Sequence, residues 1–239
     1  ITIPEGVKTI EYGVFSGCTG LVSITIPESV ESMGSDVFKD CPKLTSVTLP
    51  QYSKLGYWSN PFRDMPGDVF ENASILYYEN GNGTVRIGGA IGRVKDGETL
   101  VIPKYINGKK VVRVSGGGFK YCAGLKKVEL ADGFQAVGTS MFAYCKELEE
   151  VRLPNSITSV KENAFRGCST LQSITLPEGV KYIDSAAFYR CSSLQSITLP
   201  KGLEKIDRNV FRECASLESV TLPEGLQEIG RSAFYNCSS

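Results

Sequence analysis

The sequence of 239 residues contains no histidine. Without an imidazole, neither a Ser-His-Asp triad nor a Cys-His pair can be built, and the side chain that most often binds metal ions is missing. None of the eight cysteines occurs in the Cys-x-x-Cys spacing that is typical of zinc sites. We therefore expect no enzymatic activity, no cofactor and no metal site.

Two further absences narrow the class of protein. No apolar run approaches the roughly 18 residues that a membrane-spanning helix needs, so we expect no membrane span in this sequence. The 26 basic and 26 acidic side chains leave no net charge, which argues against nucleic acid as the partner, because nucleic-acid-binding proteins usually carry a basic excess. Residues 93–127 depart from this balance with nine Lys or Arg against two acids. This excess indicates a solvated face or, alternatively, a weak site for an anionic partner.

What the sequence does contain is a repeat, in which a phenylalanine and a cysteine three residues apart return every 23 residues. A fixed period in this range is the signature of a solenoid, whose repeats are coils stacked on one another. We expect free, buried thiols in a column beside the rings, with disulfides between adjacent coils as the alternative. The pairs, all predicted to be structural, are Phe15/Cys18, Phe38/Cys41, Phe119/Cys122, Phe142/Cys145, Phe165/Cys168, Phe188/Cys191, Phe211/Cys214 and Phe234/Cys237.

Residues 171–193 are a clean copy of the repeat. The polar–apolar alternation of 173–176 predicts a strand with one buried face, and Pro177 ends it because proline has no N–H for a ladder. Val180 and Ile183 predict a second short strand or bend, and Ala187-Phe188-x-x-Cys191 predicts a tight helical turn. About ten such coils, roughly 4.7–4.9 Å apart as in a parallel sheet, would bury each other's apolar faces.

The regular pattern fails between Gln51 and Lys110. We expect a regular array over 1–50, an irregular segment over 51–98 with a β-hairpin near 74–88, and a second array over 99–239, all as a piece of a longer protein. The hairpin is indicated by the Asn82-Gly83 dipeptide between two strand-like runs. The irregular segment also holds the only tryptophan, Trp58, beside Tyr57. These aromatic residues plug the gap between two arrays or, alternatively, contact a partner.

The outward positions of the strands give the other candidate contact residues. They form uniform rows of Ser and Thr that change, near the middle of the chain, to Lys127, Glu129, Glu150 and Arg152. A binding site is expected where the rows stop being uniform, since Ser and Thr are usual on a solvated strand face. The full candidate set for partner binding is Tyr57, Trp58, Tyr77, Arg86, Lys127, Glu129, Glu150 and Arg152.

The unit resembles the BspA-like, or treponemal-type, leucine-rich repeat family. The resemblance rests on Ile174-Thr175-Leu176-Pro177, on Val180-x-x-Ile183 and on Ala187-Phe188-x-x-Cys191, and it covers about 1–50 and 99–239. It implies a right-handed leucine-rich-repeat solenoid, mostly β, with a parallel sheet on one side and irregular turns on the other. It also implies a bacterial cell-surface or secreted protein that adheres to host proteins or to other microbes.

Two functions follow from this resemblance and from the candidate residues. The first is a recognition and adhesion module whose partner is a host matrix or microbial surface protein. The second is a structural spacer that binds nothing itself, and an intracellular scaffold is a more remote alternative. A monomer is expected, although uncapped terminal coils would allow edge-to-edge association.

Overall fold

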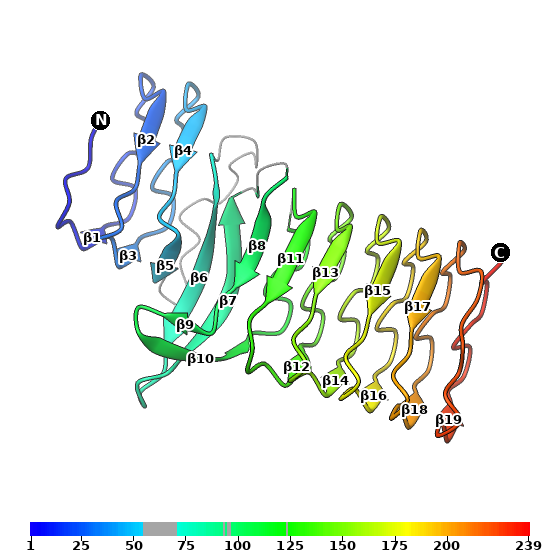
Figure 1. Ribbon diagram of the computed structural model, residues 1–239. Helices are drawn as coiled ribbons and strands as arrows, with labels where there is room; N and C mark the ends of the chain where they lie inside the picture. Colours follow the sequence, from blue (N-terminus) through cyan, green and yellow to red (C-terminus); the bar gives the residue numbers. More distant parts are fainter. Residues whose placement is uncertain (55–70, 93, 95–96, 123) are drawn as a thin grey trace.

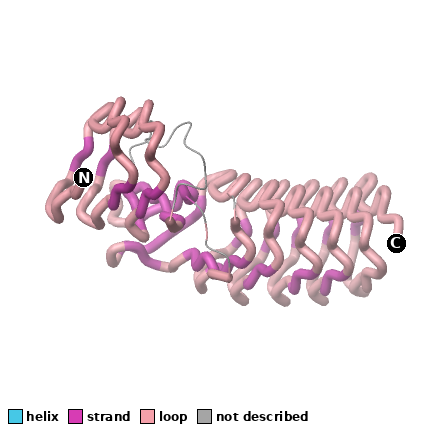
Figure 2. The backbone as a smooth tube through the Cα atoms, turned by 90° about the horizontal axis from the view of Figure 1, so that it is seen from above, coloured by secondary structure: helices cyan, strands magenta, loops and turns pink. Residues whose placement is uncertain are grey.

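The computed structural model describes residues 1–54, 71–92, 94, 97–122 and 124–239. These residues form an elongated solenoid of about nine turns, where the sequence predicted about ten, with the two termini at opposite ends (Figure 1). In the regular array, strands gather on one side and turns on the other (Figure 2). The predicted leucine-rich-repeat solenoid is therefore confirmed.

Strands that precede a repeat proline pair in parallel with the equivalent strand of a neighbouring coil, in separate short sheets. Ser173 lies opposite Ser196 and Ile174 opposite Ile197, so the register shift equals one period. Burial alternates as predicted, with Ile174 buried between two exposed neighbours. Strands of this type are β2 (Ser23–Thr25), β4 (Ser46–Thr48), β8 (Thr99–Ile102), β11 (Lys127–Leu130), β13 (Glu150–Arg152), β15 (Ser173–Thr175) and β17 (Ser196–Thr198).

A second row of two-residue strands follows, as the Val-x-x-Ile spacing predicted. These strands also pair in parallel at the repeat spacing, for example Ile183 with Ile206. They are β1 (Thr9–Ile10), β3 (Ser32–Met33), β12 (Ala136–Val137), β14 (Ser159–Val160), β16 (Tyr182–Ile183), β18 (Lys205–Ile206) and β19 (Glu228–Ile229).

The Phe-x-x-Cys segments form hydrogen-bonded turns, and no helix occurs in the part of the chain that the structure describes. Cys145 N donates to Phe142 O at 3.1 Å, as in a helical turn, but Ser140 before this turn and Tyr144 within it have φ of 52° and 60°. A left-handed residue costs about 1–2 kcal/mol and stops the helix from continuing. The predicted helical turn is therefore a tight turn that contains a left-handed residue and follows another.

These left-handed residues recur in the other coils and are held by hydrogen bonds along the solenoid. Ser140 N, Phe142 N and Tyr144 N donate to carbonyl oxygens of the next coil at 2.9, 2.8 and 2.6 Å. Each such bond contributes roughly 0.5–1.5 kcal/mol, which offsets part of the conformational cost. The turn face thus has its own intercoil ladder, and its backbone groups are already paired.

The phenylalanine rings form the predicted interior column. Rings from Phe119 to Phe234 stack at 5.3–5.8 Å between centroids, and Phe119, Phe142, Phe165, Phe188 and Phe211 are at most 1% exposed. Phe15 and Phe38 stack at 5.6 Å in a separate, smaller core that extends from Ile10 to Leu49.

All eight cysteines are free thiols, and those of the central coils lie beside the ring column. Cys168 Sγ donates to Phe142 O of the preceding coil at 3.2 Å, and Cys145, Cys191 and Cys214 make the equivalent bond at 3.0–3.1 Å. Cysteine suits this position of the repeat because its side chain is small and apolar and its S–H group is a weak hydrogen-bond donor. The predicted column of free thiols is present.

The predicted hairpin joins the two cores. It comprises β6 (Ala73–Glu79) and β7 (Val85–Gly92), which pair antiparallel around the turn at residues 80–84. Beside them lie β5 (Tyr52–Lys54), parallel to β6, and β10 (Lys109–Val114), parallel to β7. Strand β9 (Tyr105–Ile106) completes this five-stranded sheet by a second hairpin with β10.

Glycines make the contact between the hairpin and the array possible. Gly118 occupies the slot before phenylalanine that holds Val, Met or Ala in other described coils, and the carbonyl oxygen of Gly88 lies close to it. A Cβ at Gly89 would overlap the carbonyl oxygen of Gly118, and Gly89 has a φ of 152°. Backbone here packs directly against backbone, which only glycine allows.

Candidate binding site

The four charged candidates on the sheet come together as the sequence predicted, but they neutralise one another. Lys127 lies opposite Glu150 and Glu129 opposite Arg152 in neighbouring strands β11 and β13. Arg152 Nε contacts Glu150 Oε1 at 2.8 Å, and Arg152 Nη1 lies 3.7 Å from Glu129 Oε2. Lys127 Nζ is 3.9 Å from Glu150 Oε2. We call these four residues the sheet-face cluster.

The candidates in the hairpin segment are placed differently from one another. Arg86 stacks over the Tyr78 ring at 4.7 Å and donates from Nη1 to Ser115 Oγ at 3.2 Å. Tyr77 is only 5% exposed, packs in the larger core and accepts a hydrogen bond from Asn107 Nδ2 at 3.1 Å. Burial therefore corrects the assignment of Tyr77, whose ring is part of the core. Tyr57 and Trp58 lie outside the described residues.

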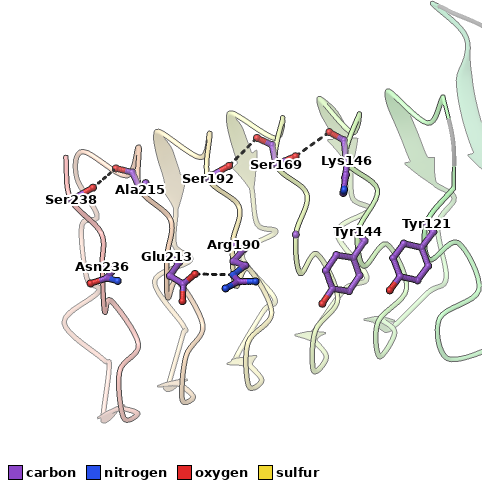
Figure 3. Close-up of a pocket in the computed structure, with 11 residues that line it drawn as sticks. Tyr121, Tyr144, Lys146, Ser169, Arg190, Ser192, Glu213, Ala215, Asn236 and Ser238 are labelled. Atoms are coloured by element: carbon purple, nitrogen blue, oxygen red, sulfur yellow. Dashed lines mark hydrogen bonds and ion pairs between the residues drawn. The ribbon is translucent and has the colours of Figure 1, made fainter.

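A hollow of about 950 Å³ lies on the turn face. We call it the turn-face groove (Figure 3). One wall consists of the left-handed residues two positions after each phenylalanine, namely Tyr121, Tyr144, Gly167, Arg190, Glu213 and Asn236. The other wall consists of residues four positions after each phenylalanine, namely Lys146, Ser169, Ser192, Ala215 and Ser238.

Gly167 interrupts the first wall. A Cβ at this position would lie 2.7 Å from Tyr144 Cδ1, so the Tyr144 ring leans over the glycine. Because glycine carries no side chain, the wall is open between Tyr144 and Arg190, as Figure 3 shows.

Aromatic rings and cations stack along one side of the groove. Tyr121 and Tyr144 stack at 5.0 Å, and Lys120 Nζ lies over both rings at 4.9 and 5.6 Å. Arg166 lies between the rings of Tyr144 and Tyr189, at 5.7 and 4.7 Å. Its Nε is buried with no hydrogen-bond partner among the described residues, so stacking on the two rings is what holds this end of the guanidinium.

Charges in the groove are only partly paired. Glu213 accepts hydrogen bonds from Arg190 Nε at 2.8 Å, from Tyr189 Oη at 3.1 Å and from Arg212 Nε at 3.3 Å. The bond from Arg190, above all, holds the pKa of Glu213 below its usual value, and the same bond raises the pKa of Arg190. Lys146, by contrast, has no ion-pair partner among the residues that the structure describes.

Sequence reasoning missed this groove because it considered the outward positions of the strands and the irregular segment, and took the turns as structural. The available signal was the slot two residues after phenylalanine, which reads Tyr, Tyr, Gly, Arg, Glu and Asn in the second array. The phenylalanine slot, by comparison, keeps one residue type. Variation at a slot fixed on a rigid turn is what a contact surface would show.

Comparison with known proteins assigns the chain to a family. A model of the BspA type leucine-rich repeat region matches six copies over residues 1–65 and 113–239. The chain therefore belongs to the BspA-type leucine-rich repeat family, as its repeat predicted. No curated protein matches the chain.

Solved structures of bacterial proteins share the fold. A leucine-rich cell surface protein of Faecalibacterium prausnitzii A2-165 is 26% identical with a TM-score of 0.56, over 93% of this chain and 62% of that one. A leucine-rich repeat protein of Treponema pallidum is also 26% identical with a TM-score of 0.55, over 69% of this chain and 86% of that one. This chain thus spans less than two thirds of the first of these proteins.

A third structure shows the fold alone. It is a leucine-rich repeat protein of Bacteroides ovatus, 20% identical with a TM-score of 0.51 over 99% of this chain and 72% of that one. Within the described residues, no helix is long and apolar enough to cross a membrane, and no group of three or more Cys, Asp or Glu is arranged to hold a metal ion.

Proposed function

We propose that this chain is a protein-recognition and adhesion module, without enzymatic activity, of a bacterial cell-surface or secreted protein. The family supports a binding role, and the name of the Faecalibacterium prausnitzii relative supports the location. The observation that carries the proposal is the turn-face groove, which combines tyrosine and arginine with Lys146, a lysine that has no ion-pair partner within the described part of the chain. Tyrosine and arginine are enriched where proteins bind one another.

The contact surface has a principal and a secondary part. The principal part is the turn-face groove, where Tyr121 is 63% exposed. The secondary part is the sheet-face cluster together with Arg86, whose charged groups a partner would have to separate from their present neighbours. Exposed ion pairs contribute only about 0–1 kcal/mol each, so a partner could replace them with its own contacts at a small cost in free energy.

Display of the chain on beads, with host matrix proteins and bacterial surface proteins as ligands, tests the proposal. Tyr121→Ala combined with Tyr144→Ala should abolish most capture of a protein that the unmodified chain binds. Tyr12→Ala is the matched control, since Tyr12 is 68% exposed in the first array and should leave capture unchanged. Thermal melts show whether each variant remains folded.

The same assay separates recognition from the spacer. Pairing within the sheet-face cluster is the observation that favours a spacer, because that face satisfies its own charges. Unchanged capture in the tyrosine variant, in Arg86→Ala and in Arg152→Ala would reject recognition by these surfaces and favour the spacer.

A further inference from the structure

The ligand of the turn-face groove can be narrowed from the charges around it, if the proposed function holds. The charged residues that line the groove are Lys146, Arg190 and one carboxylate, Glu213. Three further cations, Lys120, Arg166 and Arg212, lie against tyrosine rings of the same turns. Glu213 already accepts bonds from two of the arginines. The groove therefore has unbalanced positive charge, which attracts an anionic ligand.

The wall that holds Lys146 and the serines offers hydrogen-bond acceptors to that ligand. Ser169 Oγ donates to Lys146 O at 3.4 Å and Ser192 Oγ donates to Ser169 O at 3.5 Å (Figure 3). Each hydroxyl directs its single proton to a carbonyl oxygen of the preceding coil, so its oxygen lone pairs can accept hydrogen bonds from a ligand. A partner that fits the groove carries anionic groups toward Lys146 on this wall and Arg190 on the opposite wall, and N–H donors toward the serines.

The stacked tyrosines have one ring largely covered and one exposed. Tyr121 covers one face of Tyr144 at 5.0 Å and Arg166 lies over Tyr144 at 5.7 Å, whereas Tyr121 itself is 63% exposed. A polypeptide can carry carboxylates together with N–H donors along its whole length, which matches both the cations and the serine hydroxyls of the groove. A sulfated glycan, which could stack on Tyr121, is the alternative that the experiment distinguishes.

The length of the groove fits an extended segment. It crosses six coils, from Tyr121 to Ser238, which span about 24 Å at the spacing of paired strands. An extended chain rises about 3.3 Å per residue, so about seven residues fill it. We infer that the turn-face groove binds an extended, acidic polypeptide segment of about this length, with its carboxylates toward Lys146 and Arg190.

Fluorescence anisotropy with a labelled, glutamate-rich octapeptide tests the inference. We expect saturable binding that weakens with added salt, and no binding of the same peptide with glutamine in place of glutamate. Lys146→Glu should weaken binding about tenfold, since the charge reversal removes an attraction and adds a repulsion between like charges. Lys43→Glu, the same charge change on the exposed Lys43 of the first array, should leave binding unchanged.

Three results would overturn the inference: equal binding of the glutamate and glutamine peptides, equal effects of Lys146→Glu and Lys43→Glu, or binding of a sulfated oligosaccharide with none of the acidic peptide. The bead assay distinguishes failure of this inference from failure of the proposed function. If the tyrosine variant loses capture of a protein while the acidic peptide fails to bind, recognition stands and the ligand class is wrong.

Discussion

The first array and the second array use the same repeat, yet they bury it to different extents. Phe165 and Phe188 are fully buried between ring neighbours on both sides, whereas Phe15 stacks on Phe38 alone and is half-buried. The same holds for cysteine, since Cys168 is buried and Cys18 is half-buried. The residue type is identical, so the difference comes from the number of coils that cover it.

The comparison shows that stability in this fold belongs to contacts between coils. A single coil cannot cover both faces of its own apolar side chains, and each neighbour supplies one of them. The interior of the second array should therefore respond strongly to substitution, and the first coil weakly. The following predictions test this difference, beginning with the largest expected effect.

Phe165→Ala should lower the free energy of unfolding by about 3–5 kcal/mol, because it leaves a cavity between two stacked rings. Phe15→Ala should cost about 1–2 kcal/mol, because its ring has less apolar surface to lose. Urea unfolding followed by circular dichroism measures both. Equal costs would contradict the view that neighbouring coils decide burial.

Gly89→Ala should cost more than about 2 kcal/mol, because a Cβ there overlaps the carbonyl oxygen of Gly118 where the hairpin meets the array. The control is Gly81→Ala in the hairpin turn, where a Cβ meets nothing within 4 Å and the φ is not positive. It should change stability by less than about 0.5 kcal/mol. Similar melting temperatures for the two variants would show that the glycine contact is not needed.

Alkaline pH should destabilise the second array through its thiols. Burial raises the pKa of Cys145 and of Cys214 to about 12 and that of Cys122 to about 11, from a value of 9.0. Because the folded pKa is raised, this stability is complete below pH 9 and is lost as the pH rises toward 12, at up to about 1.4 kcal/mol per pH unit for each thiol.

Urea midpoints between pH 8 and 10 measure the alkaline effect before most tyrosines ionise. Cys145→Ala should make stability fall less steeply over this range, because it removes one thiol whose pKa is raised by burial. An unchanged slope in Cys145→Ala would contradict the assigned pKa. Buried thiols should also react with a thiol reagent only as fast as the array opens.

Arg152→Ala should have the smallest effect, below about 1 kcal/mol, because its pairs with Glu129 and Glu150 are exposed to solvent. High salt should remove most of the difference from the unmodified chain. A decrease of more than about 2 kcal/mol in the free energy of unfolding, measured by urea unfolding, would show that the sheet-face cluster contributes substantially to the stability of the array.

Much of the fold could be predicted because the repeat fixes it. The period of Phe188 and Cys191 gave the stacked coils, and the alternation around Ile174 gave the buried strand face. The Asn82-Gly83 dipeptide gave the hairpin, since few sequences suit that turn. The turns were predicted less well, because left-handed residues such as Tyr144 carry no sequence signal of their own and are held by bonds to the next coil.

The binding site could be predicted only in part. Pairing of Lys127 with Glu150 and of Glu129 with Arg152 across the sheet was implicit in the register, but whether the charges satisfy one another depends on side-chain geometry. The groove beside Tyr144 was not predicted, because its walls are formed by two positions of the repeat in each of several successive coils. The division of the chain at residues 50 and 98 and the monomeric state stay predictions, which limited proteolysis and light scattering can address.

By itself, the sequence determined which side chains point inward, since a 23-residue period places equivalent residues one above another in any continuous coil. Only the tertiary structure decided where the surface is hollow and which charges remain unpaired. The reason is that an interior column needs a single repeated residue, whereas a groove arises from differences between neighbouring coils and from the bonds that hold their exposed side chains.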